Sequence, residues 1–150
     1  MKRKARNNCF RFRVLSRIAM GILSCFLALP VNAATPEQIS KEYAQDVKRE
    51  NPAFHGFSPT AGNSFFHQQR AHSDGKTVSC ATCHTSNPRN RGLTRANKEI
   101  APLAPSANPE RFTDPAKVEK WFARNCKDVL ERSCTSKEKG DFIEYLRSVR

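Results

Sequence analysis

The first 33 residues contain no aspartate or glutamate, although they hold seven of the 26 lysines and arginines. The 117 residues that follow therefore carry 19 basic against 14 acidic side chains, a formal charge of +5 rather than the +12 of the whole chain. Because the excess is concentrated in one terminal segment, the total charge gives no support to a nucleic-acid partner.

The chain also lacks an apolar run of the ~20 residues needed to span a bilayer. Residues 18–30 are mostly apolar, follow a basic segment and precede the small residues of Val31-Asn32-Ala33. This order is typical of a secretory signal peptide, so we expect residues 1–33 to be removed, leaving a periplasmic protein with no stable membrane anchor. A retained anchor is the weaker alternative, and Leu23-Ser24 makes a poor lipidation motif before Cys25.

Methionine and histidine are missing from most of the chain. The two methionines are Met1 and Met20, and none of the four histidines lies beyond His84. A processed chain would therefore contain no thioether sulfur at all, which restricts the side chains that can bind a metal ion.

The sequence does contain Cys80-Ala81-Thr82-Cys83-His84. Two thiols three residues apart, followed by a histidine, form the attachment sequence of a c-type haem. Cys80 and Cys83 can bond the two vinyl groups as thioethers, while His84 offers a nitrogen to the iron. A zinc site would need a second ligand pair, for which Cys126 and Cys134 are too far apart, and a redox dithiol would need a βαβ context. We therefore expect one covalently attached haem c.

Four helices are expected around this motif. Thr35-Pro36 begins a helix over residues 36–50, whose thin apolar side predicts packing on the surface of the domain. Ser58-Pro59 begins a second helix, expected to reach about His72. Asp114-Pro115 begins a third, to about Leu130, and the capping box at Thr135 begins the last. Residues 85–112 show no periodicity and are predicted to be a loop around the haem edge.

Gly62 lies on the apolar side of the second helix, four residues before Phe66. A glycine there indicates close approach of another backbone, and we expect the C-terminal helix at that position. Crossed terminal helices resemble those of class I cytochromes c, which implies an all-α fold. The domains expected are a signal peptide at 1–33, a helical extension at 34–57 and a cytochrome c domain at 58–150.

Polar groups of the predicted loop have candidate roles at the haem. Its basic side chains are candidates for neutralising the propionates or steering an acidic partner, or are simply solvated: Arg89, Arg91, Arg95 and Lys98. By analogy with class I cytochromes, the carbonyl of Pro102 is a candidate acceptor for the second nitrogen of His84.

The sixth iron ligand is left open by the residues alone. Ordinary electron-transfer cytochromes c use a methionine, which this chain lacks beyond Met20. The candidates are His55, His67, His72, Asn125, a lysine, water or no ligand. Asn125 interrupts an otherwise apolar helical stripe, so its amide has a hydrogen-bond partner, points out at the stripe's edge, or meets the iron.

The stretch from Thr94 to Cys134 closely resembles the sphaeroides haem protein family of oxygen-binding, high-spin cytochromes c. The residues that carry the resemblance are Lys98 to Ser106, Arg111 to Asp114, Val118 to Trp121 and Arg124 to Cys126. In that family the asparagine before the first cysteine of a disulfide ligates ferric iron and leaves on reduction. The resemblance assigns that role to Asn125, pairs Cys126 with Cys134, and implies a dihaem cytochrome c as electron donor.

The resemblance implies an exported monohaem cytochrome that takes electrons from a redox partner. It would bind a diatomic gas (O₂, NO or CO) at ferrous iron after Asn125 leaves. A simple periplasmic electron-transfer cytochrome c is one alternative. A small oxidase or peroxidase-like enzyme is the other, but it would need a distal acid or base near Asn125 that the sequence does not make evident.

Overall fold

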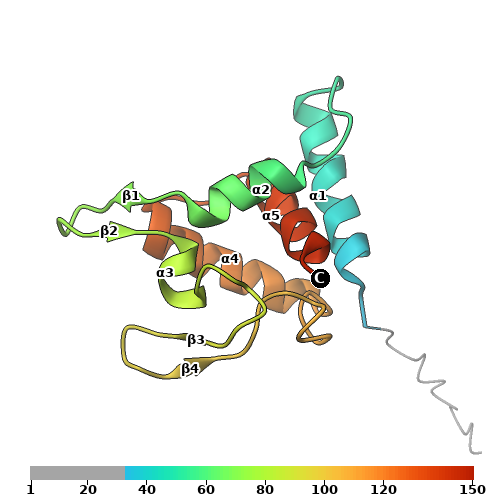
Figure 1. The fold of residues 1–150 in the computed structure, drawn as a ribbon. Helices are drawn as coiled ribbons and strands as arrows, with labels where there is room; N and C mark the ends of the chain where they lie inside the picture. Colours follow the sequence, from blue (N-terminus) through green and yellow to red (C-terminus); the bar gives the residue numbers. More distant parts are fainter. Residues whose placement is uncertain (1–32) are drawn as a thin grey trace, which may run out of the picture. The chain divides into compact units, whose positions relative to one another are not determined.

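The computed structural model describes residues 33–150 (Figure 1), so the predicted signal peptide lies outside the described residues except for Ala33. These residues form five helices and two short antiparallel hairpins, which confirms the all-α class. No helix in the described part is long and apolar enough to cross a membrane. The elements are α1 (Pro36–Glu50), α2 (Pro59–His67), β1 (Arg70–Ala71), β2 (Thr77–Val78), α3 (Cys80–His84), β3 (Gly92–Leu93), β4 (Glu99–Ile100), α4 (Pro115–Leu130) and α5 (Ser136–Ser148).

Helix α5 is the centre of the core, and both α1 and α2 pack against it (Figure 1). Ile143 and Leu146 on α5 are fully buried. At Gly62 on α2, an added Cβ would lie 2.0 Å from the carbonyl oxygen of Asp141 and 2.8 Å from the Cβ of Tyr145. The expected close approach of Gly62 to the C-terminal helix is confirmed.

Aromatic rings fill the space between these helices. The ring of Phe66 lies 5.6 Å from that of Tyr145 and 6.1 Å from that of Phe142, and Phe122 on α4 lies 5.5 Å from Phe142. The edge-to-face and tilted arrangements are the favourable ones for aromatic pairs. This cluster joins α4 to the crossing of α2 and α5.

Helix α1 has the predicted bounds and a capping box at Thr35, and it packs by one thin apolar side against α5, as expected of a helix on the surface of the domain. Ile39, Tyr43 and Val47 are buried, with Ile39 only 2% exposed. The hydroxyl of Ser40, also buried, donates to Glu144 on α5 at 2.7 Å. Three apolar residues are enough to hold α1 against α5 because the buried hydroxyl of Ser40, beside them, is hydrogen-bonded across the same interface. The division between a 34–57 extension and a 58–150 domain stays a prediction.

Helix α2 ends at His67, so the expected end near His72 is wrong. The guanidinium of Arg70 donates to the carbonyl oxygens of Phe65 and Gln68, at 3.3 and 2.8 Å, and so satisfies carbonyls left free at the helix end. The chain then forms the β1–β2 hairpin, which pairs Arg70 with Val78 and leads directly into the Cys-x-x-Cys-His motif.

The prediction of a loop over residues 85–112 is wrong in part, because this segment contains the β3–β4 hairpin. Gly92 pairs with Ile100, and the turn is closed by Thr94, whose N–H donates to the carbonyl of Lys98 at 2.8 Å. Asn97 supplies the left-handed backbone position of that turn, with φ of 55°.

The last two helices lie where their caps predicted them. The side chain of Asp114 accepts from the N–H of Lys117 at the start of α4, and Thr135 and Glu138 form a capping box at the start of α5. Cys126 lies in α4 and Cys134 in the segment before α5. Their Sγ atoms lie at bonding distance, with the Cα atoms 5.6 Å apart. That Cα separation lies within the range a disulfide bridges.

Candidate haem site

The Cys-x-x-Cys-His motif forms the single turn of α3. Ser79, 2% exposed, precedes it and donates its N–H to the hydroxyl of Thr82 at 2.9 Å. This bond holds the turn that places two thiols, Cys80 and Cys83, and His84 on one short helix. Among the described residues, neither Cys80 nor Cys83 takes part in a disulfide, and both are half-buried.

Gly92 on β3 packs directly under the motif. A Cβ at this position would lie 2.1 Å from the carbonyl oxygen of Cys83 and 3.0 Å from the Cα of His84. Any side chain would push the strand and the motif apart, so Gly92 fixes the separation of the second thiol and the imidazole from the β3–β4 hairpin. Sequence reasoning missed this residue because it lies in a stretch with no periodic pattern.

His84 is held as a neutral imidazole. Burial, with a smaller contribution from the cationic Arg111, lowers the pKa of His84 to about 4. Only the neutral ring has the free nitrogen that an iron ligand needs. Burial also raises the pKa of the Cys80 thiol to about 11, so an unattached Cys80 carries its proton at neutral pH.

The carbonyl of Pro102 accepts hydrogen bonds from Arg111 and Asn108 instead of from His84. It accepts from Nε of Arg111 at 2.7 Å and from Nδ2 of Asn108 at 3.2 Å, which uses both lone pairs of the oxygen. The expected bond from His84 is therefore wrong. Arg111, not singled out earlier, braces residues 101–102 and lies close enough to His84 to affect its pKa.

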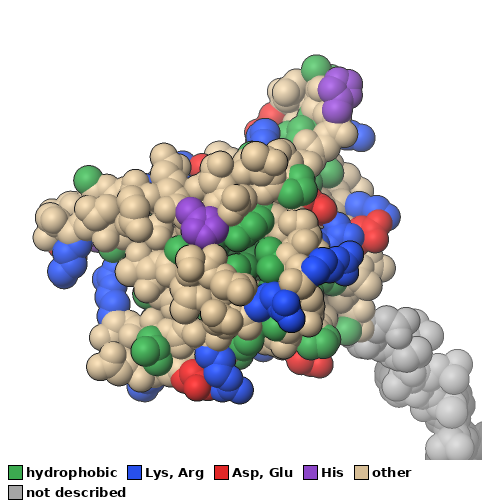
Figure 2. All heavy atoms as spheres, in the orientation of Figure 1, with side chains coloured by type: hydrophobic (Ala, Val, Ile, Leu, Met, Phe, Trp, Pro, Cys, Tyr) green, Lys and Arg blue, Asp and Glu red, His purple; other side chains and the backbone are tan. Residues whose placement is uncertain are grey.

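Large apolar side chains are left exposed in the described chain at two places. Trp121 on α4 is 43% exposed and Leu93 on β3 is 55% exposed. Figure 2 also shows hydrophobic side chains reaching the surface in the middle of one face, below α2. A contiguous patch of exposed apolar side chains marks a surface that binds an apolar partner, whereas single exposed ones are common. Together with the thiols of Cys80 and Cys83 and a neutral histidine, the patch in Figure 2 fits a flat, mostly apolar haem.

Asn125 is exposed although its helical neighbours Val118, Phe122 and Cys126 are buried. Its side chain takes part in none of the hydrogen bonds found within residues 33–150. Asn125 therefore lies at the edge of the apolar stripe, which is one of the three positions that the sequence left open for its amide. Trp121, one turn earlier, and Asp128, one turn later, share this side of α4.

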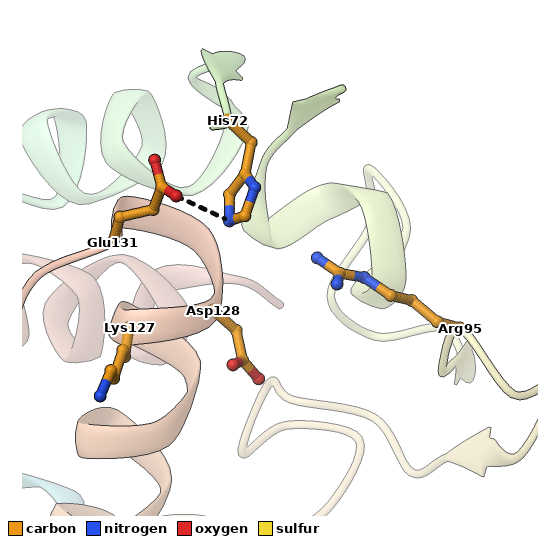
Figure 3. Close-up of a pocket in the computed structure, with 5 residues that line it drawn as sticks. All are labelled: His72, Arg95, Lys127, Asp128 and Glu131. Atoms are coloured by element: carbon orange, nitrogen blue, oxygen red, sulfur yellow. Dashed lines mark ion pairs between the residues drawn. The ribbon is translucent and has the colours of Figure 1, made fainter. Parts of the chain in front are cut away.

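Asp128 shows where that side of α4 points. It lines a hollow of about 300 Å³ together with Lys127 and Glu131 of α4, His72 of the β1–β2 hairpin and Arg95 of the β3–β4 turn. In Figure 3 Asp128 and Arg95 point toward one another across this hollow, with α3 beside it. The side of α4 that carries Asn125 therefore borders the space flanked by both hairpins.

The other histidines already have partners or lie apart. Both ring nitrogens of His67 face backbone carbonyls, of Asn63 and Ser86, at 3.0 Å. Nδ1 of His72 lies 3.1 Å from Asp74 and its Nε2 lies 3.6 Å from Glu131 (Figure 3). His55 is exposed in the segment between α1 and α2. Iron binding by His67 or His72 would have to break these contacts, whereas Asn125 has none to break.

The helical fold and the motif on α3 define a c-type cytochrome, with one covalently attached haem c. The comparison with family models matches residues 52–146 to a domain of unknown function (DUF1924). The chain is 42% identical over 127 residues to the cytochrome c-type protein SHP of Cereibacter sphaeroides, covering 83% of this chain and 94% of SHP. It is 39% identical over 127 residues to cytochrome c'' of Methylophilus methylotrophus, covering 84% and 88%.

Solved structures agree with these relatives. The crystal structure of oxidized cytochrome c'' from Methylophilus methylotrophus matches with a TM-score of 0.72 at 40% identity, over 77% of this chain and 94% of that one. The structure of oxidized SHP, described as an oxygen-binding cytochrome c, matches with a TM-score of 0.67 at 38% identity, over 76% and 96%. The chain belongs to the SHP and cytochrome c'' family of c-type cytochromes.

Proposed function

We propose that this protein is an exported monohaem cytochrome that accepts electrons from a redox partner, a dihaem cytochrome c by resemblance, and binds a diatomic gas. In this proposal Asn125 occupies the distal iron position in the ferric protein and leaves it on reduction. The observation that carries the proposal is the position of Asn125, which is exposed, has no side-chain hydrogen bond among residues 33–150, and lies on the side of α4 that borders the hollow.

The relatives support both parts of the proposal. SHP is described as an oxygen-binding cytochrome c. A solution structure of cytochrome c'' concerns haem-ligand detachment in that protein. We propose that this chain also binds a gas at the haem iron and loses an iron ligand on reduction, and that the ligand is Asn125.

Four residues would hold the haem. Cys80 and Cys83 would form the thioethers, and His84 and Asn125 would be the iron ligands. The haem supplies one-electron transfer and a coordination position for a small gas. Gly92 keeps the proximal turn against β3, and burial keeps the ring of His84 neutral.

Asn125 is suited to a position that must open. An amide oxygen is a neutral, hard and weak donor, which binds a more highly charged ion better than a less charged one. Val118, Phe122 and Cys126 anchor the same helix in the core, and we propose that a Cys126–Cys134 disulfide tethers its end. Asn125 would therefore leave by rotation of its side chain, without unfolding of α4.

The test compares Asn125→Ala with the wild type and with Asn63→Ala, which removes an exposed helical asparagine from α2. Asn125→Ala should keep its haem, change the ferric absorption spectrum and speed azide binding to the ferric form. Carbon monoxide binding to the ferrous form should change much less, because Asn125 has already left. Asn63→Ala should behave as the wild type in all of these measurements.

An unchanged ferric spectrum in Asn125→Ala would place the sixth ligand elsewhere, and His55, His67 and His72 would be tested next. A wild-type ferrous protein whose spectrum is indifferent to carbon monoxide would instead identify a simple electron-transfer cytochrome.

A further inference from the structure

Four basic residues follow one side of α4: Lys117, Lys120, Arg124 and Lys127, here named the α4 basic stripe. They are spaced three, four and three residues apart and are all exposed, on the side of the helix away from buried Val118, Phe122 and Cys126. At a rise of about 1.5 Å per residue the stripe is about 15 Å long. Neighbouring charges are closer together than the Debye length of about 8 Å, so they act as one positive surface.

Several basic side chains outside α4 are paired with carboxylates. On α5, Lys137 lies 2.5 Å from Asp141 and Lys139 lies 2.8 Å from Glu119. Arg132 lies 2.6 Å from Glu138.

The stripe differs from these pairs. Arg124 approaches Asp128 only to 3.9 Å. Within residues 33–150, Lys117, Lys120 and Lys127 take part in none of the ion pairs. Among the described residues, the least compensated part of the stripe is therefore Lys117 and Lys120, whereas Asp128 pairs with Arg124 and lines the hollow with Glu131 beside Lys127.

A fifth cation extends this surface onto the neighbouring hairpin. Arg95 in the turn between β3 and β4 lines the same hollow as Lys127 (Figure 3). Arg95 also takes part in none of the ion pairs among the described residues. Lys127 and Arg95 thus lie at the same hollow, which Asp128 and Glu131 also line, beside the space assigned to the haem.

We propose that the α4 basic stripe is the docking surface for the electron donor, and that the donor presents an acidic patch to it. The proposal rests on the proposed function. The same helix carries Asn125, so a donor seated on the stripe is held against the element that would contribute the distal ligand. Encounters between redox proteins are small and transient, and complementary charge mainly raises their association rate.

The experiment measures reduction of the ferric, haem-loaded protein by two reductants at several ionic strengths. One is flavodoxin hydroquinone, an acidic protein donor, and the other is flash-generated riboflavin semiquinone, which is uncharged at neutral pH. The double variant Lys117→Glu with Lys120→Glu reverses half of the stripe. The matched control, Lys41→Glu with Lys48→Glu, makes the same change in net charge on exposed residues of α1.

The stripe variant should be reduced by flavodoxin about tenfold more slowly at low ionic strength, with the difference disappearing at high salt. Its rate with riboflavin semiquinone should equal that of the wild type. The α1 control should stay within about twofold of the wild type with both reductants, because long-range steering depends on the local potential at the docking surface.

An equal loss in both double variants would mean that net charge alone matters, and would overturn the proposal. So would an unchanged flavodoxin rate in the stripe variant. Binding to phosphatidylglycerol vesicles that is lost in the stripe variant, with unchanged flavodoxin rates, would assign the stripe to an anionic membrane instead. The carbon monoxide spectrum tests the gas-binding function separately, since it does not depend on the protein donor.

Discussion

Gly62 and Gly92, one on each side of the haem motif along the chain, each lie against the backbone of another element. At Gly62 the atom that blocks a side chain is the backbone oxygen of Asp141, which cannot turn away as a flexible side chain would. At Gly92 it is the backbone oxygen of Cys83. The first glycine sets the helix crossing, and the second sets the position of the haem motif.

Gly62→Val should lower the free energy of unfolding by about 1 to 3 kcal/mol, because α2 and α5 must separate to admit the side chain. Denaturant unfolding of the haem-loaded protein measures this loss. Ser64→Val, at an exposed position of the same helix, is the control and should cost a few tenths of a kcal/mol, on the order of an ordinary surface change. Equal losses in the two variants would contradict the close crossing.

Gly92→Ala should instead impair haem attachment. The new Cβ would displace Cys83 and His84 from β3, so the yield of protein with covalent haem should fall at least about twofold. Haem absorbance per mole of purified chain measures the yield. Ala96→Val, exposed in the turn of the same hairpin, should keep the wild-type yield. A fully loaded Gly92→Ala protein would show that the contact is not needed.

The sequence could predict one of these glycines and not the other. Gly62 lies in a helical pattern, where its place on the apolar side implies a close neighbour. Gly92 meets Cys83 only because β3 returns under α3, and a two-residue strand leaves no periodic trace. Asn125 is similar to Gly62: its place at the edge of a stripe could be predicted, whereas the hollow beside it depends on two hairpins that the sequence did not reveal.

Among the secondary-structure elements, helix starts were the most predictable. Thr35, Ser58, Asp114 and Thr135 each accept a hydrogen bond from a first-turn N–H, so side-chain chemistry alone marks these starts. The end of α2 was missed because Arg70, beyond the helix, satisfies its last carbonyls. The place of α1 on the surface of the domain could be predicted from its thin apolar side, whereas its packing partner, α5, could not.

The ion pair of Glu138 predicts a pH dependence for the start of α5. Two hydrogen bonds from Arg132, at 2.6 and 2.8 Å, are the largest cause that lowers the pKa of Glu138 below its ordinary value of 4.5. The folded state therefore favours the charged carboxylate. This stabilisation is fully present above pH 4.5 and is lost as the pH falls through the lower folded-state pKa.

Glu138→Gln should therefore be less stable than the wild type by about 1 kcal/mol at neutral pH, with the difference shrinking toward zero in acid. Glutamine keeps an acceptor for the N–H of Thr135 but never acquires the charge. Urea unfolding at a series of pH values measures the difference. Glu42→Gln, exposed on α1, should show no such trend. A constant difference for Glu138→Gln at all pH values would rule out the ion pair as the cause.

For the whole molecule, we propose export with removal of residues 1–33. The supporting pattern is a basic segment, an apolar segment of about 13 residues and a small-residue end, too short in its apolar part to span a bilayer. Mass spectrometry of the periplasmic fraction should find a chain that begins at Ala34 and carries one haem. An intact Met1 terminus in the membrane fraction would show that the segment is retained as an anchor.

The central place of α5 in the core has a consequence for the order of events during synthesis. Ribosomes make the chain from its N-terminus, so Gly62, Phe66 and the Cys80–His84 turn are complete many residues before Ile143 and Leu146 exist. Helices α1 and α2 have α5 as their main packing partner, although α2 also contacts α3 and Tyr43 of α1 lies against Phe122 of α4. We therefore expect a chain that ends before α5 to lack the main surface on which α1 and α2 pack, and to leave Cys80 and Cys83 more open to haem than in the complete domain.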